Sequence, residues 1–141
     1  MATPMQIPLP SPQKELALNG VCSYHIEGET LYLDVAEVAS RRSAGSVSGG
    51  LSLEIWALES AYNSGNFSGY LIASQSLGSL SGQHCFRNCS ATLPMQMPTE
   101  GVWTLVLMLR ESTDGGLVTQ DYINFSQQVL AECKMTLSLC S

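Results

Sequence analysis

Charged side chains are scarce in this sequence. They make up 13% of the 141 residues, against roughly a quarter in an average soluble protein. With 12 acidic and 6 basic residues the net charge is -6, so the chain repels polyanions on average and we expect no nucleic-acid partner. Its one basic doublet, Arg41-Arg42, precedes a loop rich in Ser and Gly, and we expect both side chains to be solvated.

Long apolar runs are missing as well. A membrane helix requires about 18 consecutive apolar residues, whereas the longest run here, VWTLVLML at residues 102–109, has the length of a strand. We therefore expect no membrane insertion. The first residues have neither the basic start nor the apolar core of a secretion signal, and the residues alone leave the localisation open.

The sequence motifs of the common enzyme classes are absent. There is no GxGxxG, phosphate-binding loop, HExxH or calcium loop, and three loops that resemble a nucleophile elbow carry Val47, Phe67 and Leu80 where the serine must stand. We therefore expect no catalytic activity. Two histidines, His25 and His84, keep an unrecognised small hydrolase open as a third hypothesis, because catalytic partners need only meet in space.

What the sequence does contain is a period of two. In the segment from residue 29 to 39, Leu31, Leu33 and Val35 fall on one face, and Tyr32 and Asp34 fall on the other. Similar runs separated by turn-rich breaks predict strands over residues 21–26, 29–39, 51–58, 69–77, 85–93, 102–111 and 117–125. With no convincing amphipathic helix between them, they predict an all-β fold, an antiparallel β-sandwich of seven or eight strands, immunoglobulin-like or related.

The two ends of the chain differ from this pattern. Residues 1–15 carry four prolines and predict an extended N-terminal arm, while residues 16–141 form a single β-sandwich domain. Near the C-terminus helical and strand spacings compete, and we favour a terminal strand over residues 134–139. The strand at 102–109 is apolar on both faces, so it is either central and covered or part of an interface. A homo-oligomer through this strand or through sheet edges is a further hypothesis.

Four segments carry a resemblance to a known kind of domain. In chain order they are SGGLSLEIWAL, SGYLIASQSLGSL, EGVWTLVLMLRE and GGLVTQDYINFS. Over about residues 20–126 they resemble a small β domain of secreted or surface proteins of bacteria, often appended to peptidases and other hydrolases. The resemblance implies a secreted or surface location and an accessory, binding or structural role. Its signatures are strand and turn patterns, so it assigns no site residue, and the cysteines and the tail after Ser126 depart from it.

Two of the five cysteines, Cys85 and Cys89, stand four positions apart beside a histidine. On a straight strand they share a face and lie about 13 Å apart, at roughly 3.3 Å per residue. A disulfide requires Cα atoms within about 7 Å, and a shared zinc requires about 2.3 Å from each sulfur. Their pairing with each other therefore depends on a turn at residues 86–88.

The cysteines leave three interpretations open: buried free thiols, disulfides from Cys133 and Cys140 back to Cys85, Cys89 or Cys22, and a metal site. The metal interpretation gives the alternative function, a small metal- or redox-responsive protein. It would use Cys85, Cys89 and His84, with Cys133 or Cys140 completing the site. We expect no cofactor otherwise.

Four aromatic residues are candidates for a ligand surface, because their rings offer a large contact area and a polar handle. They are Trp56, Tyr62, Tyr70 and Tyr122. The other interpretation makes them packing residues of strands and loops. The first functional hypothesis is a non-catalytic accessory or interaction module that binds a protein or carbohydrate partner or supports the assembly of a larger protein.

Overall fold

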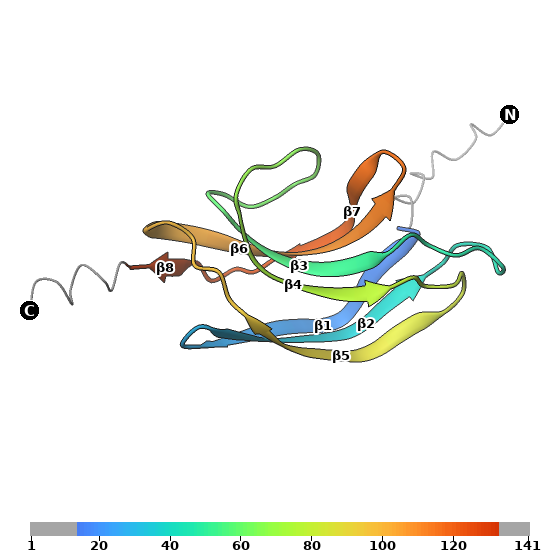
Figure 1. Ribbon diagram of the computed structural model, residues 1–141, viewed down its shortest axis with the longest axis horizontal. Coiled ribbons are helices and arrows are strands. Elements are labelled where there is room, and N and C mark those ends of the chain that lie inside the picture. The colour runs from blue at the N-terminus through green and yellow to red at the C-terminus, as the bar shows by residue number, and fades with distance from the viewer. Residues whose placement is uncertain (1–13, 133–141) are drawn as a thin grey trace, which may run out of the picture.

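The computed structural model describes residues 14–132, which form two antiparallel sheets packed face to face (Figure 1). The predicted all-β sandwich is confirmed. Its strands are β1 (Leu16–Glu27), β2 (Thr30–Ser40), β3 (Leu51–Leu58), β4 (Tyr70–Gly78), β5 (Cys85–Pro94), β6 (Gly101–Thr113), β7 (Gly116–Asn124) and β8 (Val129–Ala131). In this part of the chain no helix is long and apolar enough to cross a membrane.

The smaller sheet has the order β1-β2-β5, and the larger one has the order β4-β3-β6-β7 with β8 paired to the first residues of β6. Alternation places one face of each strand in the core: Leu31, Leu33 and Val35 of β2 are at most 1% exposed. All seven strands predicted from this period are present. β8 was not predicted, and the strand expected over residues 134–139 lies outside the described residues.

Irregular pairing interrupts the edge strands of both sheets. The register shifts between Asn19 and Cys22 of β1, at two places along β4, and on β7 opposite the step from Leu109 to Arg110. Such shifts mark β-bulges, in which an extra residue bends the strand. At the β1 bulge Gly20 has a φ of 75°, and a Cβ there would lie 2.8 Å from the Cβ of Ala36. The sheets are therefore bent at their margins.

Strand β6 is covered on both faces, which accounts for the apolar residues on both of its sides. Residues 103–109 are all buried. Leu105, Leu107 and Leu109 pack in the main core between the sheets, whereas Val106 and Met108 belong to a second apolar cluster on the other side of the sheet. The loop between β3 and β4 supplies the cover of this second cluster, and Figure 1 shows it arching over the larger sheet. Of the two alternatives for this strand, the structure has the central, covered one.

The expectation that Arg42 is solvated is wrong. Its guanidinium makes two hydrogen bonds to the carboxylate of Glu111, at 2.7 and 2.8 Å, and its Nε donates to Glu15 at 3.1 Å. The backbone N–H of Gly49 and the amide of Gln120 donate to the same Glu111 carboxylate, both at 2.9 Å. Only 22% of the Arg42 side chain and 5% of the Glu111 side chain are exposed. The pair joins the end of β2 to β6 and so links the two sheets.

Candidate functional site

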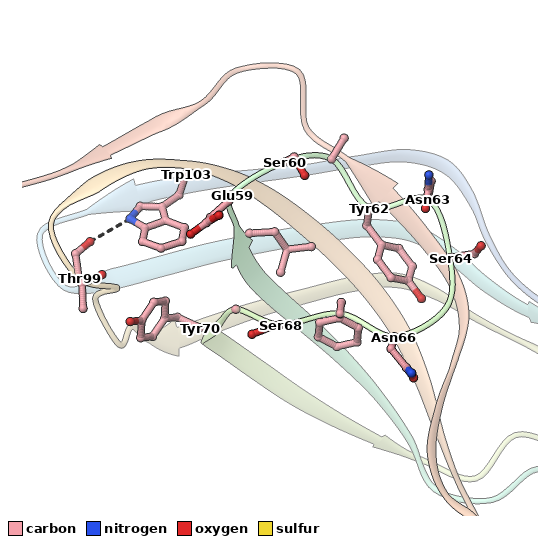
Figure 2. Close-up of a pocket in the computed structure, with 14 residues that line it drawn as sticks. Glu59, Ser60, Tyr62, Asn63, Ser64, Asn66, Ser68, Tyr70, Thr99 and Trp103 are labelled. Atoms are coloured by element: carbon pink, nitrogen blue, oxygen red, sulfur yellow. Dashed lines mark hydrogen bonds between the residues drawn. The ribbon is translucent and has the colours of Figure 1, made fainter.

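The loop between β3 and β4, residues 59–69, encloses a hollow of about 810 Å³ (Figure 2). Its sequence is rich in Ser, Asn and Gly, which favour turns over regular structure. At its tip Ser64 and Gly65 both have positive φ angles, 112° and 81°. The loop therefore swings out as an open ring and returns to the sheet at β4, instead of closing a tight hairpin. Ligand pockets commonly have volumes of about 300–1,000 Å³.

Two aromatic residues anchor this loop. The Tyr62 side chain is buried, its hydroxyl donates to the carbonyl of Gly65 at 2.7 Å, and its backbone exchanges two hydrogen bonds with the amide of Asn124 on β7. Phe67 packs edge-on against Trp56 and Tyr62, with ring centroids 4.8 and 5.5 Å apart. These contacts hold the apolar side of the loop on the sheet.

Six of the fourteen residues that line the hollow carry uncharged hydroxyl or amide side chains. The hydroxyl and amide residues that line it are Ser60, Asn63, Ser64, Asn66, Ser68 and Thr99. Figure 2 draws one hydrogen bond among the lining residues, from the indole N–H of Trp103 to the carbonyl of Thr99 at 2.9 Å. The polar side chains that line the hollow thus make no hydrogen bonds to one another. Each of these hydroxyl and amide groups can both donate and accept a hydrogen bond to a ligand.

A carboxylate and two aromatic rings meet at one end of the hollow. The pairing of β3 with β6 ends at Leu58 opposite Thr104, and the residues next to this pair, Glu59 and Trp103, both line the hollow. Tyr70 packs edge-on against Trp103, with centroids 5.3 Å apart and ring planes at 83°. Figure 2 shows the three side chains at the same end of the ring, remote from Tyr62. We call Glu59, Tyr70 and Trp103 the acidic corner.

The structure divides the four aromatic residues proposed as a ligand surface. Trp56, Tyr62 and Tyr122 gather with Phe67 in the second apolar cluster, where the rings of Tyr62 and Tyr122 lie 4.7 Å apart. They support the loop more than they present a surface. Tyr70 stands apart from them at the hollow and is 41% exposed. Sequence reasoning missed two further rings, because Phe67 lies in a loop without periodicity and Trp103 was assigned only to the predicted strand.

A second hollow, of about 720 Å³, lies on the other face of the same loop. Its wall includes Trp56, Phe67 and Arg110. The Arg110 guanidinium lies over the Phe67 ring at 5.1 Å and contacts the carboxylate of Glu54 at 3.3 Å, and the indole N–H of Trp56 donates to that carboxylate at 2.8 Å. Because Glu54 balances its charge, Arg110 offers no free charge to a ligand there.

The paired cysteines do not lie as a straight strand would place them. Asn88 has a φ of 53° within β5, a left-handed conformation that Asn tolerates better than most residues. It reverses the alternation, so that Phe86 and Cys89 both pack against the core. Cys85 lies on the outer face, where its side chain interacts with Glu37. The strand is therefore not straight and the two cysteines do not share a face, while the pairing of β5 with β2 keeps one register on both sides of Asn88 without a reversing turn.

Three cysteines lie within the described residues, Cys22, Cys85 and Cys89, and all are free. Cys22 and Cys89 flank Val35 from the two neighbouring strands. Two strand spacings are about 9.6 Å, which exceeds the reach of a disulfide. Burial raises the pKa of both thiols, which disfavours the reactive thiolate. Cys133 and Cys140 lie outside the described residues.

Both histidines interact with groups that do not belong to the predicted metal site. The Nδ1 of His84 donates to the carbonyl of Gly82 at 2.9 Å. The Nε2 of His25 lies 3.0 Å from Glu27, and its ring stacks on Tyr32. Within residues 14–132 no group of three or more His, Cys, Asp or Glu side chains is placed to hold a metal ion. The metal and redox hypothesis therefore stays a prediction without a site among these residues.

Comparison of the chain with protein-family models, with curated proteins and with solved structures finds no match. The resemblance to bacterial accessory domains therefore stays a prediction.

Proposed function

We propose that this protein is a non-catalytic binding module and that the hollow enclosed by residues 59–69 binds a carbohydrate. The observation that carries this proposal is the wall of uncharged hydroxyl and amide side chains beside the exposed ring of Tyr70. Sugar hydroxyls both donate and accept hydrogen bonds, as do Ser and Asn side chains. The apolar C–H face of a sugar packs against an aromatic ring, which supplies contact area at little cost in entropy.

The size and stiffness of the hollow support the same ligand class. About 810 Å³ of space accommodates a small saccharide. The loop is fixed on the sheet by the bonds between Tyr62 and Asn124 and by the packing of Phe67. A ligand therefore need not order the loop, and more of the contact energy appears as affinity.

The charged groups of the hollow favour binding over hydrolysis. Glu59 is the one carboxylate among the lining residues, and none of them is His, Cys, Lys or Arg. Most glycoside hydrolases use a pair of carboxyl groups separated by about 5–9.5 Å. The resemblance to domains appended to hydrolases implies an accessory role of the same kind.

A glycan array screened with the full chain, followed by calorimetry on the best saccharide, tests this function. We expect Tyr70→Ala to weaken binding by about tenfold, equivalent to about 1.4 kcal/mol. Tyr32→Ala is the matched control, because Tyr32 is 37% exposed, close to the 41% of Tyr70, but lies on the smaller sheet. Absence of saccharide binding by the unmodified chain, or equal loss in both variants, would rule out the hollow as a carbohydrate site.

A further inference from the structure

We infer that the acidic corner of Glu59, Tyr70 and Trp103 binds an ammonium group, so that the preferred saccharide carries a free amine, as glucosamine units do. This inference rests on the proposed function and names the ligand class of the same hollow.

The geometry of the corner suits a cation. The rings of Tyr70 and Trp103 are nearly perpendicular, at 83°, with centroids 5.3 Å apart. Trp103 is buried, at 8% exposure, and supports Tyr70, which is 41% exposed, so Tyr70 is the ring that is open to the hollow. The face of an aromatic ring attracts an ammonium group within about 6 Å of its centroid. Glu59, the residue that follows the end of β3, supplies an exposed carboxylate at the same end of the hollow (Figure 2).

The charge of the corner is uncompensated within the described residues. Glu59 takes part in none of the six ion pairs formed between residues 14 and 132, and no Lys or Arg lines the hollow. The chain as a whole carries a net charge of -6. Both the local and the overall field therefore attract a cation and repel carboxylated, sulfated or phosphorylated sugars.

A neutral sugar uses only part of this corner. It can donate a hydroxyl hydrogen bond to the Glu59 carboxylate and pack on Tyr70, but it lacks the positive charge that the carboxylate and the ring of Tyr70 attract. Two unit charges about 4 Å apart in water interact by an amount that corresponds to about a fivefold change in affinity, and partial shielding by the rings increases it. We therefore expect an amine-bearing saccharide to bind about five- to tenfold more tightly at low salt.

Calorimetry with the full chain tests the inference, with glucosamine trimer and N-acetylglucosamine trimer as the two probes. We expect the five- to tenfold preference for the free amine, measured as the ratio of the two affinities within one variant, to disappear in Glu59→Gln. Glu29→Gln is the matched control, since it removes the same charge from the exposed turn between β1 and β2 and should keep the preference. Equal affinities of the two probes for the unmodified chain, or an unchanged preference in Glu59→Gln, would overturn the inference that the acidic corner binds an ammonium group.

A third probe separates failure of the corner from failure of the proposed function. Tetramethylammonium chloride, titrated while the two indole N–H signals are followed by NMR, should shift that of Trp103 and leave that of Trp56 in place. If this shift occurs in the unmodified chain and not in Glu59→Gln, while no saccharide binds, the corner is a cation site and the carbohydrate function is wrong. If both trimers bind equally and the Trp103 signal does not move, the carbohydrate function stands. The inference that the acidic corner binds an ammonium group is then wrong.

Discussion

Two hydrogen bonds join Tyr62 and Asn124, and each residue donates one of them. The backbone N–H of Tyr62 donates to the Oδ1 of Asn124 at 2.9 Å, and the Nδ2 of Asn124 donates to the carbonyl of Tyr62 at 2.8 Å. One amide side chain at the end of β7 thus satisfies both backbone groups of a residue 62 positions earlier in the chain. The loop that encloses the hollow owes its fixed position to this side chain as well as to the packing of Phe67.

We expect Asn124→Ala to loosen this loop. The variant leaves two partly buried backbone groups of Tyr62 without partners, which should lower the free energy of unfolding by about 1–3 kcal/mol. Hydrogen exchange within residues 59–69 should become faster. Asn19→Ala is a suitable control, because Asn19 also makes an amide hydrogen bond, to Glu37 at 3.0 Å, but on the smaller sheet. Unchanged exchange in the loop would show that its packing alone holds it.

Arg42→Ala should be strongly destabilising. It removes the two hydrogen bonds that neutralise the buried Glu111 carboxylate, and breaking one partner of a buried pair typically costs about 3–5 kcal/mol. Because the Arg42 side chain is 22% exposed, we expect about 2–3 kcal/mol, measured by urea unfolding. Arg41→Ala, a change at the exposed neighbour, should cost less than about 0.5 kcal/mol. Equal losses in the two variants would contradict the role given to Arg42.

The same pair should make the fold sensitive to acid. Hydrogen bonds from Arg42, the largest cause, hold the pKa of Glu111 below its ordinary value of 4.5, and burial opposes them. A carboxyl whose pKa is lower in the folded state stabilises the fold above its unfolded pKa and loses that contribution as the pH falls through the folded value. Unfolding free energy measured from pH 7 to pH 3 should therefore begin to fall near pH 4.5. In Arg42→Ala the fall should be shallower, and an unchanged slope would assign it to other carboxyls.

The thiols of the smaller sheet should react slowly in the folded protein. Burial raises the pKa of Cys22 and of Cys89, so at a given pH less of each is present as the reactive thiolate. Mass spectrometry after brief iodoacetamide treatment at pH 8 should find both residues labelled more slowly in buffer than in urea. Full labelling of Cys22 and Cys89 at the unfolded rate would place them at an accessible surface.

The sequence predicted the fold where the deciding signal was local. The alternation of Leu31, Leu33 and Val35 is readable within a few residues and survives in the structure as the buried face of β2. Two buried residues of β6 outside the main core, Val106 and Met108, made the strand apolar on both faces, and this too was visible. β8 escaped because three residues, Val129–Ala131, are too few to show a period.

The site was predictable only in part, because its defining contacts join distant residues. Tyr70 was a candidate from its type alone, but its neighbour Trp103 is 33 positions away and meets it only through the pairing of β3, β4 and β6. Arg42 was misread for the same reason, since its partner Glu111 lies 69 residues further on. The sequence indicated the left-handed conformation of Asn88 only weakly. An Asn within a strand pattern is compatible with a bulge, but the sequence does not say which way the flanking cysteines then face.

The bulges in the edge strands bear on how the protein behaves at high concentration. β1, β4 and β7 are each interrupted by a register shift, and β5 carries Asn88 in a left-handed conformation. An incoming strand would need a regular row of backbone donors and acceptors, and each of these four edges breaks that row. Stacking of copies edge to edge into fibrils is thereby hindered at every one of them. The protein can carry long, apolar strands such as β6 in its interior while its margins give amyloid growth no continuous template.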